Sequence, residues 1–210
     1  MIIDSFLFFQ ELDLLEIRLE YLYPLVDHFI IIEARQSFKG NAKDYIFEKN
    51  INRYEKYLDK IIYYKVEDTH FSYNGLIDFL EESDSNVKKT ISKFIKKHDY
   101  YDKNNLSYIL DSYHRECIHI ALEQKCKDSD IVLLSDLDEI PSFKIIKDFK
   151  KGKKLDGPTV FIQHEFQYFL NNYAKSDWNG TIASPYILIK KYSLNELRNN
   201  TKKLPSIINA

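Results

Sequence analysis

Apolar runs and apolar stripes alternate along the chain from its start. Ile2–Phe9 is an apolar run, and leucines then recur at the spacing of one helix face, at Leu12, Leu15, Leu19 and Leu22. After Pro24, which ends the predicted helix, His28–Ile32 is a second apolar run. This strand–helix–strand order is a βαβ unit, which predicts two parallel strands joined by a right-handed crossover.

The alternation continues to the end of the chain. Further strands are predicted at Ile61–Val66, Ile131–Leu134, Thr159–Ile162, Glu165–Leu170 and Thr181–Lys190. Further helices are predicted at Tyr108–Lys125, Ser142–Lys150 and Ser193–Asn199. The pattern predicts an α/β fold, with a mostly parallel sheet flanked by helices, and the length predicts a single domain over residues 1–210.

Composition narrows the setting. Thirty basic and 32 acidic residues give a formal charge of −2, so no strong field favours nucleic acid, and no nucleic-acid partner is expected. The chain shows neither a basic leader nor an apolar span of transmembrane length, and Cys117 and Cys126 have no metal-ligand spacing. We therefore expect free thiols and a cytoplasmic protein.

Three carboxylates directly follow the predicted strand Ile131–Leu134, at Asp136, Asp138 and Glu139, and Pro141 comes next. Ligands of open α/β sheets bind outside the carboxyl ends of strands. Carboxylates so close repel one another unless a cation or protons share the site. We predict Asp136 and Asp138 as ligands of Mg²⁺ or Mn²⁺, which prefer hard oxygen donors. The alternative is a solvated turn that caps the next helix.

A metal held by two such carboxylates is typically completed by substrate phosphates, which suggests a phosphorylated ligand and a departing diphosphate. The haloacid-dehalogenase phosphatases begin with the same pattern and use the first Asp as a nucleophile. Their signature lies near the N-terminus and continues Asp-x-Asp-Gly-Thr/Val, whereas this one continues Glu139-Ile-Pro. A phosphohydrolase that uses Asp136 is therefore the weaker alternative.

Four segments, in order, resemble glycosyltransferase family 17, which includes the transferase that adds bisecting GlcNAc to N-glycans. They are Phe6-Leu-Phe-Phe-Gln-Glu-Leu-Asp-Leu-Leu-Glu-Ile-Arg-Leu, Phe29-Ile-Ile-Ile-Glu-Ala, Ser135-Asp-Leu-Asp-Glu-Ile-Pro and Trp178-Asn-Gly-Thr. The resemblance implies a GT-A-like, Rossmann-like fold that binds a nucleotide sugar. It also implies inverting transfer from a UDP-sugar, with UDP-GlcNAc favoured, to a saccharide or glycan acceptor.

The resemblance also assigns donor-binding residues. Asp136 and Asp138 would bind the metal that bridges the two phosphates. Glu33 matches an acid of the family and would contact ribose or base edges, or alternatively cap the following loop. Arg115, in Tyr113-His-Arg115-Glu116, resembles the arginine of the family's Arg-Glu pair and suits a phosphate, with a surface ion pair as its alternative.

The acceptor side is expected around an aromatic strand and the segment after it. Tyr168, Trp178 and Asn179 are the expected sugar contacts, because aromatic faces and amides suit sugar rings. An inverting transfer needs a base for the acceptor hydroxyl, and Glu165 and Asp177 are the candidates, with His164 as a further one. The alternative for Tyr168 is core packing. The alternative for Glu165 and Asp177 is a solvated surface position, and that for His164 is a structural role.

The family continues into a Gly-Trp-His-Phe segment about where this chain stops, at residues 207–210. We therefore expect a truncated chain, or a shortened protein with weak or no turnover. A non-catalytic nucleotide-sugar-binding remnant is the corresponding alternative function.

Overall fold

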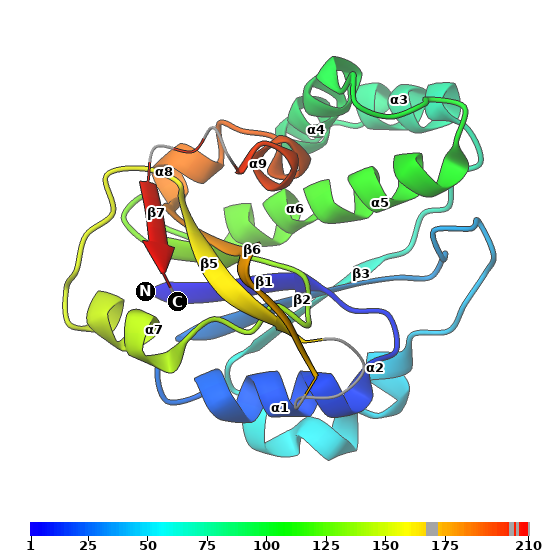
Figure 1. The fold of residues 1–210 in the computed structure, drawn as a ribbon. Coiled ribbons are helices and arrows are strands. Elements are labelled where there is room, and N and C mark those ends of the chain that lie inside the picture. The colour runs from blue at the N-terminus through cyan, green and yellow to red at the C-terminus, as the bar shows by residue number, and fades with distance from the viewer. Residues whose placement is uncertain (167–171, 202–203, 205, 210) are drawn as a thin grey trace.

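The computed structural model describes residues 1–166, 172–201, 204 and 206–209. Within these residues, seven strands form one sheet in the order β3-β2-β1-β4-β6-β5-β7 (Figure 1). Their bounds are β1 Ile2–Leu7, β2 His28–Ala34, β3 Ile61–Val66, β4 Ile131–Leu134, β5 Thr159–Phe166, β6 Tyr173–Pro185 and β7 Ser206–Asn209.

Most neighbouring strands run parallel. β1 pairs in parallel with both β2 and β4, β2 with β3, and β5 with β7, whereas β6 runs antiparallel to β4 and β5. The predicted α/β class with a mostly parallel sheet is confirmed. The chain order reverses between β1 and β4, which are adjacent in the sheet but far apart in sequence, and such a switch point leaves a crevice at the carboxyl ends of the strands.

Helices cover both faces of the sheet (Figure 1). One face carries α1 (Leu12–Leu22), α2 (Ile46–Lys49), a 3-10 segment (Ile51–Tyr57) and α7 (Phe143–Lys150). The other carries α5 (Leu106–Glu116) and α6 (Ile118–Lys125), with α3 (Tyr73–Glu82), α4 (Asn86–Lys97), α8 (Tyr186–Ile189) and α9 (Leu194–Asn199) around them.

Two apolar clusters follow from this layering. Successive strand residues point to opposite faces, so Ile30 and Ile32 enter one cluster while Phe29 and Ile31 enter the other. Because helices cover both faces of the sheet, the sequence of β2 is a continuous apolar run rather than an alternation of apolar and polar residues.

The structure corrects several predicted elements. The helix expected over Tyr108–Lys125 is divided at Cys117, which ends α5 and begins α6. The strand expected over Thr181–Lys190 is wrong beyond Pro185, because the N–H groups of Tyr186 and Ile187 bond to loop carbonyls at Asp130 and Asp128, and the chain turns into α8.

The C-terminal strands also differ from expectation. β5 is continuous to Phe166, through irregular pairing with β6, and the rest of the range predicted to end at Leu170 lies outside the described residues. β6 begins at Tyr173 and so includes Trp178-Asn-Gly, while β7 was not predicted. Among the residues that the structure describes, no helix combines the length and apolar character needed to cross a bilayer.

Candidate active site

The acidic loop, Ser135–Glu139, follows β4 at the switch point. Arg18 of α1 binds this loop. The Arg18 guanidinium donates to the carbonyl oxygens of Asp136 (2.9 Å), Leu137 (2.9 Å) and Glu139 (3.3 Å) and to Ser135 Oγ (2.5 Å). Three bonds to carbonyl oxygens and one to a side-chain hydroxyl hold the loop, so a buried group rather than solvent sets the direction of the loop's side chains.

Arg18 is in turn held by Asp4 of β1. Its Nε and Nη2 donate to the two carboxylate oxygens of Asp4 at 2.8 and 2.7 Å, and both side chains are fully buried. A bidentate pair of this kind fixes geometry as well as charge. The sequence carries a signal for this pair, because Arg18 lies on the leucine face of the predicted helix.

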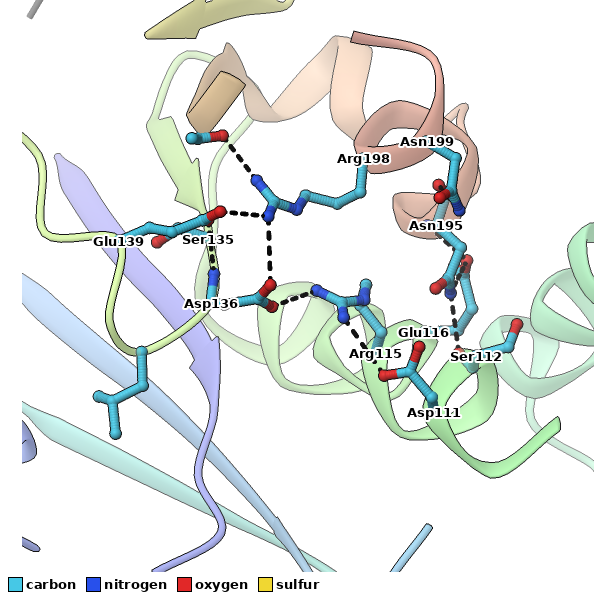
Figure 2. Close-up of polar contacts among 12 residues, drawn as sticks. Asp111, Ser112, Arg115, Glu116, Ser135, Asp136, Glu139, Asn195, Arg198 and Asn199 are labelled. Atoms are coloured by element: carbon cyan, nitrogen blue, oxygen red, sulfur yellow. Dashed lines mark hydrogen bonds and ion pairs between the residues drawn. The ribbon is translucent and has the colours of Figure 1, made fainter. Parts of the chain in front are cut away.

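Asp136 lies between two arginines from different helices (Figure 2). Arg115 Nη1 of α5 is 2.6 Å from Asp136 Oδ1, and Arg198 Nη2 of α9 is 3.2 Å from Oδ2. Burial alone would raise the pKa of Asp136, but the charges of Arg115 and Arg198 outweigh it and hold the pKa below its usual value. The carboxylate is therefore a stable anion that keeps the two guanidinium groups together.

Glu139 links the acidic loop to β6 and α9. Its Oε2 accepts from the Asp136 N–H at 3.0 Å, and its Oε1 accepts from Trp178 Nε1 at 2.8 Å and from Arg198 Nη2 at 2.6 Å. Arg198 also donates to the Gly180 carbonyl at 2.6 Å. The third carboxylate of the acidic cluster thus positions two side chains that the sequence placed far away.

Gly180 permits this arrangement by its lack of a side chain. A Cβ at this position would lie 1.8 Å from Gln163 Oε1. That Gln163 side chain accepts from the Thr181 N–H at 2.7 Å and donates to the Ile140 carbonyl at 2.8 Å. Any larger residue would displace the bridge that joins β5, β6 and the end of the acidic loop.

Glu116, next to Arg115, fixes the helix that carries Arg198. Its carboxylate accepts from Ser193 Oγ (2.6 Å) and from the N–H groups of Leu194 (3.2 Å) and Asn195 (3.1 Å) at the start of α9. Burial would raise the pKa of Glu116, but hydrogen bonds from His119, Ser193 and Asn195 lower it to about 2. Arg115 and Glu116 therefore position both cations around Asp136, one directly and one through α9.

Two cavities open beside this cluster. The switch-point cavity, of about 380 Å³, lies at the carboxyl ends of β1, β2 and β4, and its lining includes Phe9, Phe38 and Asp138. The β6 cavity, of about 510 Å³, has Trp178 and Arg198 in its lining. Both are also lined by Asp111, Arg115 and Asp136. The two cavities therefore meet at the arginine-bound carboxylate.

The structure brings together most of the residues expected from sequence. Arg115, Asp136 and Asp138 line the switch-point cavity, and Asp177, Trp178 and Asn179 line the β6 cavity. The residues that sequence reasoning missed are Arg18, Asp111 and Arg198. Asp111 had a signal, since it lies one helical turn before Arg115, whereas nothing local marked Arg198.

Glu33 has a different place. It is fully buried, and its carboxylate accepts from Lys43 Nζ (2.8 Å), Tyr63 Oη (2.8 Å) and the N–H groups of Ile46 (2.6 Å) and Phe47 (3.1 Å). These bonds cap the start of α2. A carboxylate enclosed by four donors matches the loop cap that was the alternative for Glu33, and its expected contact with the nucleotide stays a prediction.

Two of the remaining expected residues, His164 and Glu165, lie outside the linings of both cavities. Glu165 sits on β5 opposite Lys175 of β6 and is not among the described residues that line either cavity. His164 is exposed beside Tyr173, with ring centroids 5.5 Å apart. Tyr168 lies outside the described residues, so its expected sugar contact stays a prediction.

The acidic loop suits a cation only as a site that substrate completes. Partial desolvation and the charges of Asp136 and Glu139 raise the pKa of Asp138, and a cation would relieve this repulsion. Within the described ranges, no cluster of three or more His, Cys, Asp or Glu side chains forms a metal-binding group. Asp138, with Asp136 beside it, would hold a divalent ion whose other ligands are phosphates.

Comparison with known proteins gives one family. Residues 1–106 match the model of glycosyltransferase family 17, a range that contains Asp4 and Arg18 but ends before Asp111. No curated protein matches the chain. Among solved structures, 4-diphosphocytidyl-2C-methyl-D-erythritol synthase matches with a TM-score of 0.49 at 8% identity, over 100% of this chain and 88% of that one.

Mouse xyloside xylosyltransferase 1 in its apo form matches with a TM-score of 0.37 at 12% identity, over 94% of this chain and 68% of that one. Both are distant likenesses. The family match covers β1, α1 and β2, the elements that build one wall of the switch-point cavity. The chain belongs to glycosyltransferase family 17 and is a glycosyltransferase.

Proposed function

We propose that this glycosyltransferase is a metal-assisted, inverting enzyme that moves GlcNAc from UDP-GlcNAc to a saccharide acceptor. The nucleotide occupies the switch-point cavity and the acceptor occupies the β6 cavity. The observation that carries the proposal is the meeting of the two cavities at Arg115 and Asp136. A transfer reaction needs two substrates whose reacting atoms are in contact, and two adjoining cavities with shared walls provide that arrangement.

The switch-point cavity suits a nucleotide. It lies where α/β sheets of this order bind such ligands, and its volume falls within the range of small-molecule sites. Phe9 and Phe38 in its lining are 41% and 40% exposed, so their rings are available to an apolar base face. The diphosphate would then extend toward the acidic loop and Arg115.

The leaving diphosphate would be stabilised mainly by the arginine pair. Arg115 and Arg198 converge on Asp136, and both arginine side chains are only 11% exposed, which strengthens their electric field. Asp136 keeps the two forks oriented, and phosphate oxygens can accept from the same donors. A divalent ion held by Asp138 and Asp136 would add Lewis-acid stabilisation of the leaving group.

The β6 cavity suits a saccharide. Trp178 is 39% exposed, and its Nε1 donates to Glu139, so the ring orientation is set from the acidic loop. The amide side chains of Asn179, Asn195 and Asn199 line the same cavity. An exposed indole face with polar amides around it matches the apolar faces and hydroxyl edges of a sugar ring.

A phosphohydrolase is disfavoured by the state of Asp136. Nucleophilic attack on phosphorus would need a free carboxylate oxygen, and both oxygens of Asp136 are ion-paired with arginines.

For the cellular location of the protein, we propose the cytoplasm. Cys117 and Cys126 are free, and free thiols are usual for proteins of a reducing compartment.

Calorimetry with UDP, UDP-GlcNAc and UDP-glucose, each with and without Mn²⁺, tests the proposal. We expect UDP to bind more tightly with Mn²⁺ and UDP-GlcNAc to bind more tightly than UDP-glucose. If none of the three ligands bound, a UDP-sugar donor would be refuted. Equal binding with and without Mn²⁺ would exclude a role for the metal in binding, and the arginine pair alone would then be the diphosphate site.

A further inference from the structure

An inverting transfer needs a base at the point where the acceptor hydroxyl meets the donor sugar. We propose that Asp111 of α5 is this base, an inference that rests on the proposed function. The base must contact the acceptor hydroxyl and lie next to the donor's anomeric carbon. It must therefore lie in the shared wall of the two cavities.

Three carboxylates among the described residues line the β6 cavity: Asp111, Asp136 and Asp177. Only Asp111 and Asp136 also line the switch-point cavity. Asp177 lies on β6 and lines the acceptor cavity alone. A base at Asp177 would be near an acceptor hydroxyl but away from the junction with the donor.

Asp136 is unsuited to accepting a proton. Arg115 binds its Oδ1 at 2.6 Å and Arg198 binds its Oδ2 at 3.2 Å, and their charges lower its pKa. Protonation would leave two nearly buried guanidinium groups without their shared anion. Asp136 therefore stabilises the cations, and the proton needs a different acceptor.

Asp111 has the accessibility and the restraint that a base needs. Its side chain is 37% exposed, and Arg115 Nη2 bonds its Oδ1 at a relaxed 3.3 Å, one helical turn along α5. Figure 2 shows its carboxylate beside the Arg115 guanidinium. Across the described part of the chain, we find no second ion pair to Asp111, so Oδ2 remains available to a hydroxyl.

The chemistry balances with Asp111 in this role. The acceptor hydroxyl oxygen forms a bond to the anomeric carbon while the bond from that carbon to the diphosphate oxygen breaks. The electron pair of the broken bond leaves with UDP, and the hydroxyl proton passes to the Asp111 carboxylate. Arg115 lies between the base and Asp136, so the same guanidinium orients Asp111 and faces the charge that develops on the diphosphate.

The test compares Asp111→Asn with Asp177→Asn and with Asp78→Asn, a control on the exposed side of α3. UDP release from UDP-GlcNAc is measured with water and with saccharide acceptors, and UDP affinity is measured by calorimetry. For Asp111→Asn we expect kcat to fall at least ~100-fold, the usual contribution of a positioned base, with UDP affinity within about threefold of wild type.

Three outcomes would overturn the assignment. The first is an unchanged kcat in Asp111→Asn. The second is a loss of kcat of the expected size in Asp177→Asn but not in Asp111→Asn. The third is a loss of UDP affinity in Asp111→Asn large enough to explain all of its lost activity. The last outcome would mean that Asp111 only orients Arg115. Failure of the proposed function is distinguished beforehand, because it would appear as absence of UDP binding by the wild-type protein.

Discussion

Arg18 Nη2 lies 2.7 Å from Asp4 Oδ1 in a pair with no exposure to solvent, and the same guanidinium donates to three carbonyl oxygens of the acidic loop. This pair connects β1 and α1 to the loop that carries Asp136 and Asp138. A buried ion pair contributes little net stability over an apolar replacement, but removing one partner leaves a buried charge. Its importance therefore lies in where it holds the loop.

We expect Arg18→Ala to lower the free energy of unfolding by about 3–5 kcal/mol, because Asp4 is left buried and unpaired. Chemical denaturation at pH 7 measures this. Arg53→Ala is the matched control, since Arg53 pairs with Asp13 and Glu16 at the surface and its removal should leave the free energy of unfolding nearly unchanged.

The double variant Arg18→Met/Asp4→Leu should recover only part of that loss. The apolar pair removes the unpaired charge, but the carbonyls at Asp136, Leu137 and Glu139 still lack their donor. Full recovery of stability together with wild-type UDP binding would show that Arg18 does not position the acidic loop.

Arg198→Gln should weaken UDP binding by about 10–100-fold, because hydrogen bonds to charged groups contribute about 1.5–3 kcal/mol. Calorimetry measures the change, with Arg53→Gln as the control that should leave it unaltered. Arg198→Lys should recover the charge but not the bonds to both Asp136 and Glu139. Its affinity for UDP should therefore lie between that of Arg198→Gln and that of the wild type. Wild-type affinity in Arg198→Gln would exclude Arg198 from the diphosphate site.

Asp138→Asn should abolish the Mn²⁺-dependent part of UDP binding while the protein stays folded, as judged by its melting temperature. The raised pKa of Asp138 sets the pH dependence in the wild type: the carboxylate must be ionised to bind the ion, so Mn²⁺-dependent affinity should rise as pH increases through that raised value. An Mn²⁺ effect of unchanged size in Asp138→Asn would reduce the acidic cluster to a helix cap.

Acid should destabilise the protein from about pH 6.5 downward. Burial lowers the pKa of His114 to about 3 and also lowers the pKa values of His98 and His28. Each folded-state pKa lies below the unfolded value of about 6.5, so the unfolded chain binds more protons and stability falls as pH falls. The slope is up to about 1.4 kcal/mol per pH unit for each such histidine.

His114→Phe should therefore reduce the slope of unfolding free energy against pH by about one proton between pH 7 and 5, whatever its effect on stability at pH 7. Denaturation curves at several pH values measure the slope. A slope equal to that of wild type would mean that His114 is protonated in the folded protein.

Trp178 is the single tryptophan of the chain and reports on the β6 cavity. We expect a saccharide acceptor to change its fluorescence, because the exposed part of the indole would be covered by the sugar ring. The experiment is a titration in the presence of UDP, with N-acetylglucosamine oligomers and mannose oligomers as probes. A response to UDP alone, with none to either set of oligomers, would argue against an acceptor site at Trp178.

The sequence by itself determined the class of fold and one side of the site. Strongly patterned segments such as β1, α1 and β4 were predicted because their burial is set by local periodicity. Asp136 and Asp138 were found because they directly follow a buried strand. The boundary at Pro185 was misjudged, since the bonds that start α8 come from a distant loop.

Only the tertiary structure decided which groups surround Asp136. Arg18, Arg115 and Arg198 come from three helices widely separated in sequence, and each reaches the acidic loop because the sheet places β1, β4 and β6 next to one another. Local pattern specifies which face of an element is buried but carries no information on its partner across the sheet. That is why the carboxylates and Arg115 could be predicted from the sequence, whereas Arg18, Arg198 and the pairing of Arg115 with Asp136 could not.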